Sequence, residues 1–198
     1  LTEYAQDRNH VYALTHRPEI RQYLRENGLC CKSIEKRVPN GYKFAPENIR
    51  RAVLQGLMDT DGYADARGHC SFTSISSDLA EDVQWLVRSL GGRATITSRV
   101  PVAVYPNGTK KAGATAYTVY IQTENNSGLF RLERKRKRCE GKPFNGGISE
   151  MCRKIVSIEP CGAEECQCIT VDDPEGLYLT RDFIVTHNSW AVRQKARM

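Results

Sequence analysis

Near its end the chain carries three consecutive side chains that could cut and rejoin a polypeptide: His187, Asn188 and Ser189. The side-chain amide of an asparagine can attack its own backbone carbonyl and break the next peptide bond, while a neighbouring imidazole protonates the leaving amine. A hydroxyl directly after the asparagine is a nucleophile that can receive an acyl group before that cut. The tripeptide alone is common, so its meaning depends on what precedes it.

A second group of candidate catalytic residues lies at residues 54–62, Leu-Gln-Gly-Leu-Met-Asp-Thr-Asp-Gly. Asp61 is expected at the end of a helix, where a carboxylate can hold Mg²⁺ that activates water and offsets phosphate charge. Gly56 would let a second helix approach closely, and three apolar residues are expected to pack around it: Leu54, Leu57 and Met58. Taken alone, Asp-x-Asp-Gly is more often an ordinary C-terminal turn.

Together the two groups resemble one known arrangement. Residues 54–62 resemble the motif of LAGLIDADG homing endonucleases, and residues 184–189, Ile-Val-Thr-His-Asn-Ser, are similar to the C-terminal junction of inteins, self-splicing protein inserts that often carry such an endonuclease. Further stretches that look like the family are residues 32–38, 42–44, 50–55 and 81–92. The resemblance implies an α+β fold, with LAGLIDADG-type helices packed on a curved antiparallel sheet, followed by the C-terminal β-strands of a Hint (intein) splicing fold.

For the nuclease, the resemblance implies that two such motifs pack as paired helices and that each gives one acidic residue. Asp61 would then be the catalytic metal ligand, with Mg²⁺ as the cofactor, and Asp59 a structural turn residue. Because the sequence holds one copy of the motif, the second carboxylate is expected from a missing upstream half or from another subunit. We favour the upstream half.

For splicing, the resemblance gives each residue of the junction a role. Asn188 would cyclise, His187 would assist, and Ser189 would begin the host sequence and accept the branched ester. Cys168, which we include among the catalytic candidates, lies where many inteins carry a catalytic Asp, and Gly176 lies where many carry a further His. The first splicing step would need an N-terminal intein half, in cis or in trans.

Double-stranded DNA is the partner that charge and family resemblance favour. The net charge is +6, and residues 131–142 hold seven Lys and Arg against two Glu. Such a cluster suits phosphate contact, although a solvated surface run or a nuclear-localisation lookalike has the same composition. The candidate DNA contacts are Arg99, Tyr120 and Gln122 of an expected β-ribbon, with Thr95, Thr97 and Thr118 beside them, and Arg134, Lys135, Arg136, Lys137 and Arg138.

The pattern of apolar residues, prolines and glycines predicts the elements that position these residues. Helices are expected over residues 18–27, 46–59 and 79–90, the last one capped within residues 76–78, and a turn over residues 39–41. Strands are expected over residues 70–75, 94–104 and 115–123, with residues 117, 119 and 121 on one face and 118, 120 and 122 on the other. Shorter strands are expected over residues 154–159, 166–171, 177–180 and 183–185.

Four segments follow from these elements. Residues 1–45 are expected to end a first endonuclease repeat, 46–145 to form a LAGLIDADG repeat with the basic segment, 146–188 to form the C-terminal splicing region, and 189–198 to begin the C-extein. The abrupt start without Met suggests a fragment of a longer chain.

The remaining features concern the compartment, the host and the alternatives. Eight cysteines without paired zinc spacing favour a reducing cytoplasmic setting, and no apolar run approaches the roughly 20 residues that span a bilayer. If Gly-Lys preceded Ser189 after splicing, the host would be a P-loop ATPase such as a terminase or helicase, from a bacterium or phage. The alternatives are a degenerate DNA-binding remnant and a free-standing homing endonuclease without splicing activity.

Overall fold

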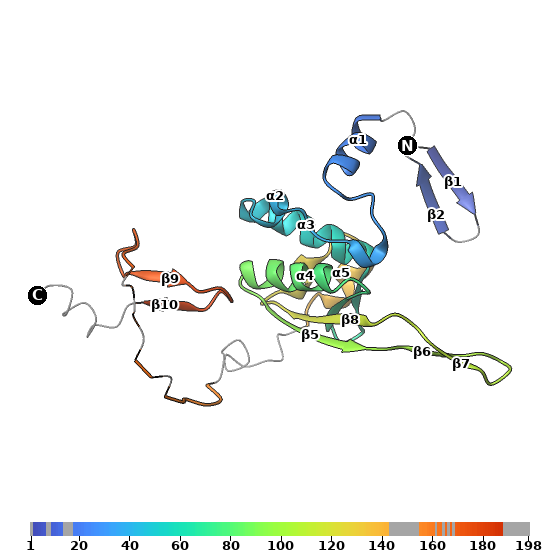
Figure 1. The fold of residues 1–198 in the computed structure, drawn as a ribbon. Helices are drawn as coiled ribbons and strands as arrows, with labels where there is room; N and C mark the ends of the chain where they lie inside the picture. The colour runs from blue at the N-terminus through green and yellow to red at the C-terminus, as the bar shows by residue number, and fades with distance from the viewer. Residues whose placement is uncertain are drawn as a thin grey trace, which may run out of the picture.

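The computed structural model describes residues 2–6, 9–13, 18–142, 155–160, 162, 163, 165, 167 and 169–187. Three predicted catalytic residues, Cys168, Asn188 and Ser189, lie outside these residues. Helices and strands alternate along the central part, and most of them form one layer of helices on one antiparallel sheet (Figure 1). Within the described residues, no helix has both the length and the apolar character needed to cross a membrane.

The sheet has four antiparallel strands in the order β3-β4-β8-β5. Their bounds are Gly62–Ala64 for β3, Cys70–Ser74 for β4, Arg93–Arg99 for β5 and Ala116–Gln122 for β8. Because side chains alternate between the two faces of a strand, cross-strand partners share a face. Phe72 of β4 and Ile96 of β5 both pair with the fully buried Val119 of β8, and this line faces the helices.

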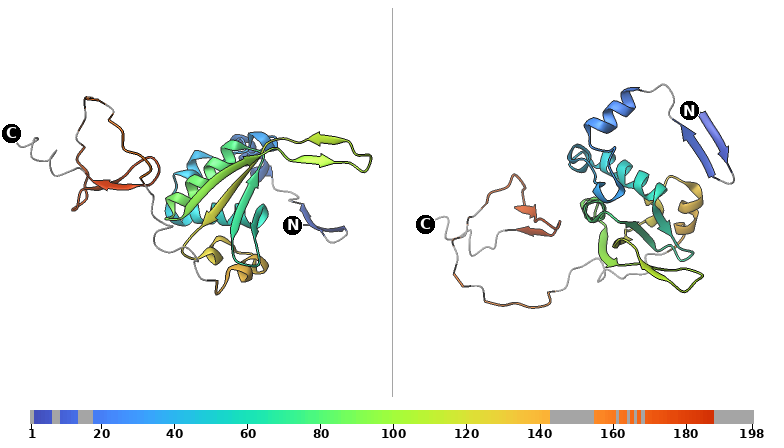
Figure 2. Two further views of the ribbon diagram at one scale, coloured as in Figure 1. Left: turned by 90° about the horizontal axis from the view of Figure 1, so that it is seen from below. Right: turned by 45° about the vertical axis from the view of Figure 1, so that its right-hand side comes forward.

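Helix α3, Glu47–Thr60, begins after Pro46 as its N-cap and buries Leu54 and Met58 in the core. Helix α4, Ser77–Ser89, lies across β4, β5 and β8. Its buried face has the helical spacing predicted from the sequence, with Leu79, Val83, Leu86 and Val87. Since α3 also contacts α4, the two helices cover the same face of the sheet, and the view from below shows the strands in front of the helices (Figure 2).

Two buried polar side chains hold the preceding segment against α4. Ser76 is the N-cap of α4: its hydroxyl accepts a hydrogen bond from the backbone N–H of Leu79 and donates one of 2.6 Å to the carbonyl of Lys36. Asp82 accepts a 2.8 Å bond from the backbone N–H of Val38 and pairs with the ammonium of Lys43. Residues 36–43 are therefore fastened to the same core as α3 and α4.

Several elements precede or flank this core. At the N-terminal end lie strands β1, Thr2–Gln6, and β2, Asn9–Ala13, helix α1, Pro18–Glu26, the 3₁₀ turn η1, Ser33–Glu35, and the short helix α2, Asn40–Lys43. Beyond β8 come the 3₁₀ turn η2, Asn126–Leu129, and helix α5, Glu133–Cys139, which contacts η2 and β3. Near the C-terminal end, β9, Leu177–Leu179, and β10, Val185–His187, form an antiparallel hairpin.

Most predicted elements are present, and five details of the prediction were wrong. The strand expected over 94–104 breaks at Pro101 into β5 and β6, Val102–Val104, and β6 pairs with β7, Lys110–Ala112, because proline cannot donate a ladder hydrogen bond. The turn expected over 39–41 begins the short helix α2. Residues 155–159 are not a strand, since no described strand pairs with them, and described residues 169–171 are not one either. Strand β10 ends later than the predicted 183–185, at His187.

Candidate nuclease and splicing sites

The two carboxylates of the motif have different surroundings. Asp59 is half-buried, and its carboxylate accepts hydrogen bonds of 3.1 and 3.2 Å from the backbone N–H of Arg131 and one of 3.1 Å from that of Leu132. Asp61 is exposed and serves as the C-cap residue of α3, directly before β3. Asp59 is thus used to hold the chain before α5, while the carboxylate of Asp61 faces solvent.

Lys135 lies directly beneath this turn. It is 7% exposed, and its ammonium donates to the carbonyls of Met58 and Asp59 at 2.8 Å and of Gly62 at 2.6 Å. Helix ends leave their last carbonyls without intrahelical donors, and a lysine ammonium can satisfy them. Loss of hydration on burial lowers the pKa of Lys135, and the charge of Arg134 lowers it further, whereas Asp59 and Asp61 oppose that change.

Two glycines of the motif have opposite surroundings. A Cβ on Gly62 would lie 2.5 Å from the carbonyl oxygen of Met58, so only glycine fits where the chain leaves α3 for β3. A Cβ on Gly56 would meet nothing within 4 Å, because Gly56 is exposed. Leu54 and Met58 point into the core of the same domain, so the expectation that they pack around Gly56 was wrong. Gly56 instead belongs to an outward face of α3 that also includes Ile49, which is 38% exposed.

The sheet face opposite the helices is polar. Tyr63, Ser71, Tyr120 and Thr95 form one cross-strand line, and Thr73, Thr118 and Thr97 form the next. The hydroxyls of Thr73 and Thr118 are 3.1 Å apart. Gln122 pairs with Arg93, and Arg99 pairs with Ala116, on this same face. The predicted ribbon residues Thr95, Thr97, Arg99, Thr118, Tyr120 and Gln122 therefore lie together.

Sequence reasoning missed one member of this face on the edge strand β3, two on the inner strand β4 and one at the start of β5. Tyr63 is 58% exposed, and Ser71 and Thr73 stand beside it on β4. The alternation of residues 70–75 was the available signal for Ser71 and Thr73. Arg93 was missed because the strand was expected to start at residue 94.

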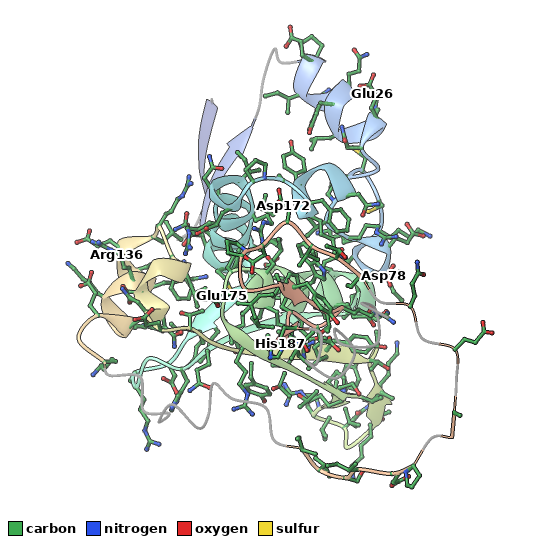
Figure 3. All side chains as sticks on the ribbon, turned by 90° about the vertical axis from the view of Figure 1, so that its left-hand side faces the viewer. Glu26, Asp78, Arg136, Asp172, Glu175 and His187 are labelled. Atoms are coloured by element: carbon green, nitrogen blue, oxygen red, sulfur yellow. The ribbon has the colours of Figure 1, made fainter. Side chains whose placement is uncertain are left out.

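Helix α5 carries the basic segment, and its five candidate residues separate into two groups. Arg134, Arg136, Lys137 and Arg138 are exposed, and Figure 3 shows Arg136 on the outer side of the helix. Within the helix, Arg136 pairs with Glu140 at 3.4 Å and Lys137 with Glu133 at 2.7 Å. Arg138 also donates to the carbonyl of Ala64 at 2.9 Å. Lys135 differs from the other four because its ammonium faces the end of α3.

Residues that could hold a divalent metal are few in the described part of the chain. No group of three or more His, Cys, Asp or Glu side chains comes together there. Mg²⁺ is commonly held by one or two carboxylates together with waters and substrate phosphates, so a single carboxylate does not exclude it. The exposed position of Asp61 fits that pattern.

The hairpin of β9 and β10 carries one of the predicted splicing residues. His187 is exposed and ends β10, where it pairs with Leu177 of β9 (Figure 3). The face that it shares also carries Leu179 and Val185, which are 59% and 61% exposed. Gly176 directly precedes β9 and has a φ of 68°.

Comparisons with known proteins identify one part of the chain by family. Residues 48–131 match the family described as a LAGLIDADG-like domain. The chain is 36% identical over 156 residues to the replicative DNA helicase DnaB of Mycobacterium intracellulare, a match that covers 78% of this chain and 26% of the helicase.

A second relative is an enzyme with a different name. The chain is 29% identical over 191 residues to the ribonucleoside-diphosphate reductase NrdEB subunit alpha of Bacillus subtilis, covering 84% of this chain and 17% of that protein. The corresponding subunit of Bacillus phage SPbeta gives the same values. The chain thus spans about a quarter or less of each relative's length. The matched range contains the four-stranded sheet, α4 and all of α3 except its first residue, so residues 48–131 are a LAGLIDADG-like domain.

Proposed function

We propose that this chain contains a DNA-cleaving homing endonuclease repeat and the C-terminal end of a self-splicing intein. The observation that carries the nuclease proposal is the exposed carboxylate of Asp61 at the end of α3, two residues before Tyr63 of the polar sheet face. The carboxylate of Asp59, by contrast, accepts hydrogen bonds from the backbone N–H groups of Arg131 and Leu132. Asp61 is the carboxylate of the motif that can reach a phosphate.

The substrate of this site is double-stranded DNA in the proposal. Hydroxyl, amide and guanidinium groups on one sheet face can read base edges, while the exposed cations of α5 contact phosphates. Arg99, Tyr120 and Gln122 remain the proposed sheet contacts, and Arg134, Arg136, Lys137 and Arg138 the proposed phosphate contacts. Lys135 is not among the proposed phosphate contacts, because its ammonium donates to the carbonyls of Met58, Asp59 and Gly62.

Asp61 would hold Mg²⁺, which in such nucleases activates the attacking water and offsets charge on the phosphate. The outward face of α3 around Gly56 supports a paired arrangement, because helices approach closely where side chains are small. A second motif packed there would bring a second carboxylate near Asp61. This second half and the DNA complete the proposed site.

The splicing proposal rests on the junction residues and on the pair of relatives. The names of the two relatives, a helicase and a ribonucleotide reductase subunit, describe different activities. Both proteins nevertheless match this chain over a small part of their length. An insert carried by unrelated hosts explains that pattern. In the proposal Asn188 cyclises with help from His187, Ser189 begins the host sequence, and Cys168 assists where many inteins have an aspartate. A helicase is the favoured host.

The nuclease proposal is tested with Asp61→Asn in the protein's complete reading frame. Plasmids carrying the host gene without the insertion serve as the target, and cleavage and binding are measured separately. The rate of DNA cleavage should fall about 100-fold or more, since the change removes the carboxylate that would hold Mg²⁺ at the phosphate. DNA affinity should stay within a few-fold, because the polar sheet face is unchanged. Equal cleavage by the variant would overturn the role of Asp61. Binding without cleavage by the unchanged protein would instead identify a DNA-binding remnant.

The splicing proposal is tested with Asn188→Ala in the same reading frame. Release of the C-terminal host segment should stop, while DNA cleavage continues at its normal rate. The matched nuclease variant, Asp61→Asn, should splice normally. Continued release in the Asn188→Ala variant would place the cut elsewhere.

A further inference from the structure

The turn of the β9–β10 hairpin is packed against α4 through an aromatic contact. Phe183 lies with its ring 5.1 Å from that of Trp85 at an interplanar angle of 72°, and Phe44 lies on Trp85 at 5.2 Å and 74°. Such edge-to-face pairs are favourable beyond the area that they bury. The ammonium of Lys43 lies 5.6 Å from the Trp85 ring. Trp85 therefore joins the segment before α3, helix α4 and the hairpin turn.

An ion pair lies beside the aromatic contact. Arg88 Nη1 of α4 donates to Asp182 Oδ1 at 2.8 Å, and the Arg88 side chain is only 24% exposed. The same guanidinium donates through Nη2 to the carbonyl of Ala94 at 3.3 Å. Because α4 and β5 both orient it, Arg88 presents a fixed donor to the hairpin turn.

The backbone of the turn is unusual at the residue that makes the contact. Phe183 has a φ of 59°, the only positive φ at a non-glycine residue in the described part of the chain. Bulky residues rarely adopt this conformation unless other interactions hold it. Two backbone hydrogen bonds close the turn: the N–H of Phe183 donates to the carbonyl of Thr180, and the N–H of Thr180 donates to the carbonyl of Ile184. The backbone of the loop therefore fixes the direction of the Phe183 ring.

The hairpin itself is short. Its strands are three residues long, and isolated two-stranded hairpins are at best marginally stable in water. Figures 1 and 2 both show its turn beside α4 and its open end directed away. The contact leaves exposed the face with Leu179, Val185 and His187, which can pack against other parts of a splicing fold.

We propose that the outer face of α4 is a docking surface for the splicing hairpin, and that Trp85, Arg88, Asp182 and Phe183 are positioning residues for the C-terminal cut. This inference rests on the proposed splicing role of Asn188. By anchoring the turn, the LAGLIDADG-like domain orders β10 and thereby the histidine at its end. The docking surface lies on the helix side of the sheet, so DNA on the polar face leaves it accessible.

The test uses the complete reading frame with two changes confined to the turn. Phe183→Gly removes the ring and suits the positive φ, so a defect cannot come from backbone strain. Asp182→Arg reverses one charge of the ion pair at a half-exposed position. Each variant should release the C-terminal host segment roughly two- to tenfold more slowly, the scale of one aromatic or charged contact. Arg181→Ala, in the same turn, should cut at the normal rate.

Charge exchange separates positioning from a general structural defect. Adding Arg88→Asp to Asp182→Arg should restore most of the lost rate, because the pair is rebuilt with opposite polarity. DNA cleavage by Phe183→Gly should remain normal. Normal release in both single variants would overturn the docking role.

Hydrogen exchange distinguishes failure of this inference from failure of the splicing proposal. In an Asn188→Ala background, where the chain should stay intact, Phe183→Gly should lower protection of the Thr180 amide while amides of α3 and α4 keep theirs. If Asn188→Ala does not stop release, the splicing assignment fails and the exchange result still decides docking. Unchanged protection of Thr180 would mean that α4 does not anchor the hairpin.

Discussion

Lys135 and Lys137 lie two residues apart on α5, yet they have different environments. Lys135 is buried and donates to the carbonyls of Met58, Asp59 and Gly62 at 2.6 to 2.8 Å. The side chain of Lys137 is 65% exposed and pairs with Glu133. Hydrogen bonds from a charged donor each contribute more than neutral ones, and a buried acceptor left without a donor costs stability. A count of positive charges in the basic segment therefore does not tell which lysine meets a phosphate.

Lys135→Met tests this difference by retaining an apolar stem of similar length and removing the ammonium. The free energy of unfolding should fall by about 2 kcal/mol, because carbonyls at the end of α3 lose their donor. Lys137→Met is the matched control and should change it by less than about 0.5 kcal/mol. Denaturant unfolding of both variants provides the measurement. Equal small effects would show that the ammonium of Lys135 is not needed at the helix end.

Asp65 at the β3–β4 turn gives a prediction about pH. Its hydrogen bond to the ring of His69, 2.8 Å long, is the main cause that lowers the pKa of Asp65 to about 2, from 3.8. A carboxyl group whose folded pKa is lowered stabilises the fold above its unfolded pKa, and this contribution is lost as pH falls through the folded value. Unfolding measured between pH 4 and pH 2 should show that loss, and Asp65→Asn should reduce the slope. An unchanged slope would contradict the assignment.

At the scale of elements, the two glycines of the motif have different surroundings, since Gly56 lies in α3 and Gly62 begins β3. Gly62→Ala would place a methyl group 2.5 Å from the Met58 carbonyl, so the free energy of unfolding should fall by about 1 to 3 kcal/mol. Gly56→Ala meets open space on an exposed helix position and should raise stability by up to about 1 kcal/mol, since alanine is the better helix former.

The two variants also differ in their expected effect on DNA cleavage. If a second motif helix packs at Gly56, Gly56→Ala should weaken cleavage while stabilising the domain, a combination that a purely structural glycine would not give. Calorimetric unfolding and plasmid cleavage, measured on the same preparations, test both effects. Full cleavage by Gly56→Ala would exclude close helix packing at that position.

The elements that the sequence predicted well are those whose pattern depends on local chemistry. Helix α1 stops before Gly28, α4 has an apolar stripe, and β8 alternates core and polar residues, as expected. Prolines marked the start of α3 correctly, but the break at Pro101 was missed because the valines around it favour a continuous strand. Residues 155–159 have a strand pattern but no strand among the described residues pairs with them, and Val156 is 97% exposed. A pattern alone does not form a strand without a partner.

The candidate site was predictable in type and less so in geometry. The motif predicted correctly that Asp61 lies at the end of a helix, whereas its metal-binding role stays a prediction. The different surroundings of Asp59 come from Arg131 and Leu132, more than 70 residues later, whose backbone N–H groups donate to its carboxylate. The hydrogen bond from Lys135 to the carbonyl of Gly62 and the ring contact between Phe183 and Trp85 are likewise long-range. No local pattern encodes them, because each depends on which elements the fold brings together.

At the scale of the whole molecule, the two proposed activities use opposite sides of one sheet. The polar face carries Arg93 and Arg99, while α4 on the other side carries the contact with the hairpin turn. The Cys70 and Cys139 sulfurs, 3.6 Å apart and buried, tie β4 to α5 within the same core, and burial raises the pKa of the Cys139 thiol. One domain can therefore hold DNA and orient a splicing hairpin without competition between them.

The salt dependence of DNA binding tests this division of surfaces. A protein that neutralises DNA phosphates releases the counterions bound to them. The logarithm of the binding constant therefore falls linearly with the logarithm of the salt concentration, with a slope of nearly one for each phosphate contacted. Arg99→Ala and Arg134→Ala should each weaken binding across sequences and reduce that slope by about 1. Arg181→Ala removes the same charge from the hairpin turn on the helix side and should leave the slope unchanged. Binding titrations from low to moderate salt measure all three, and an equal loss from Arg181→Ala would mean that net charge, and no particular face, binds the DNA.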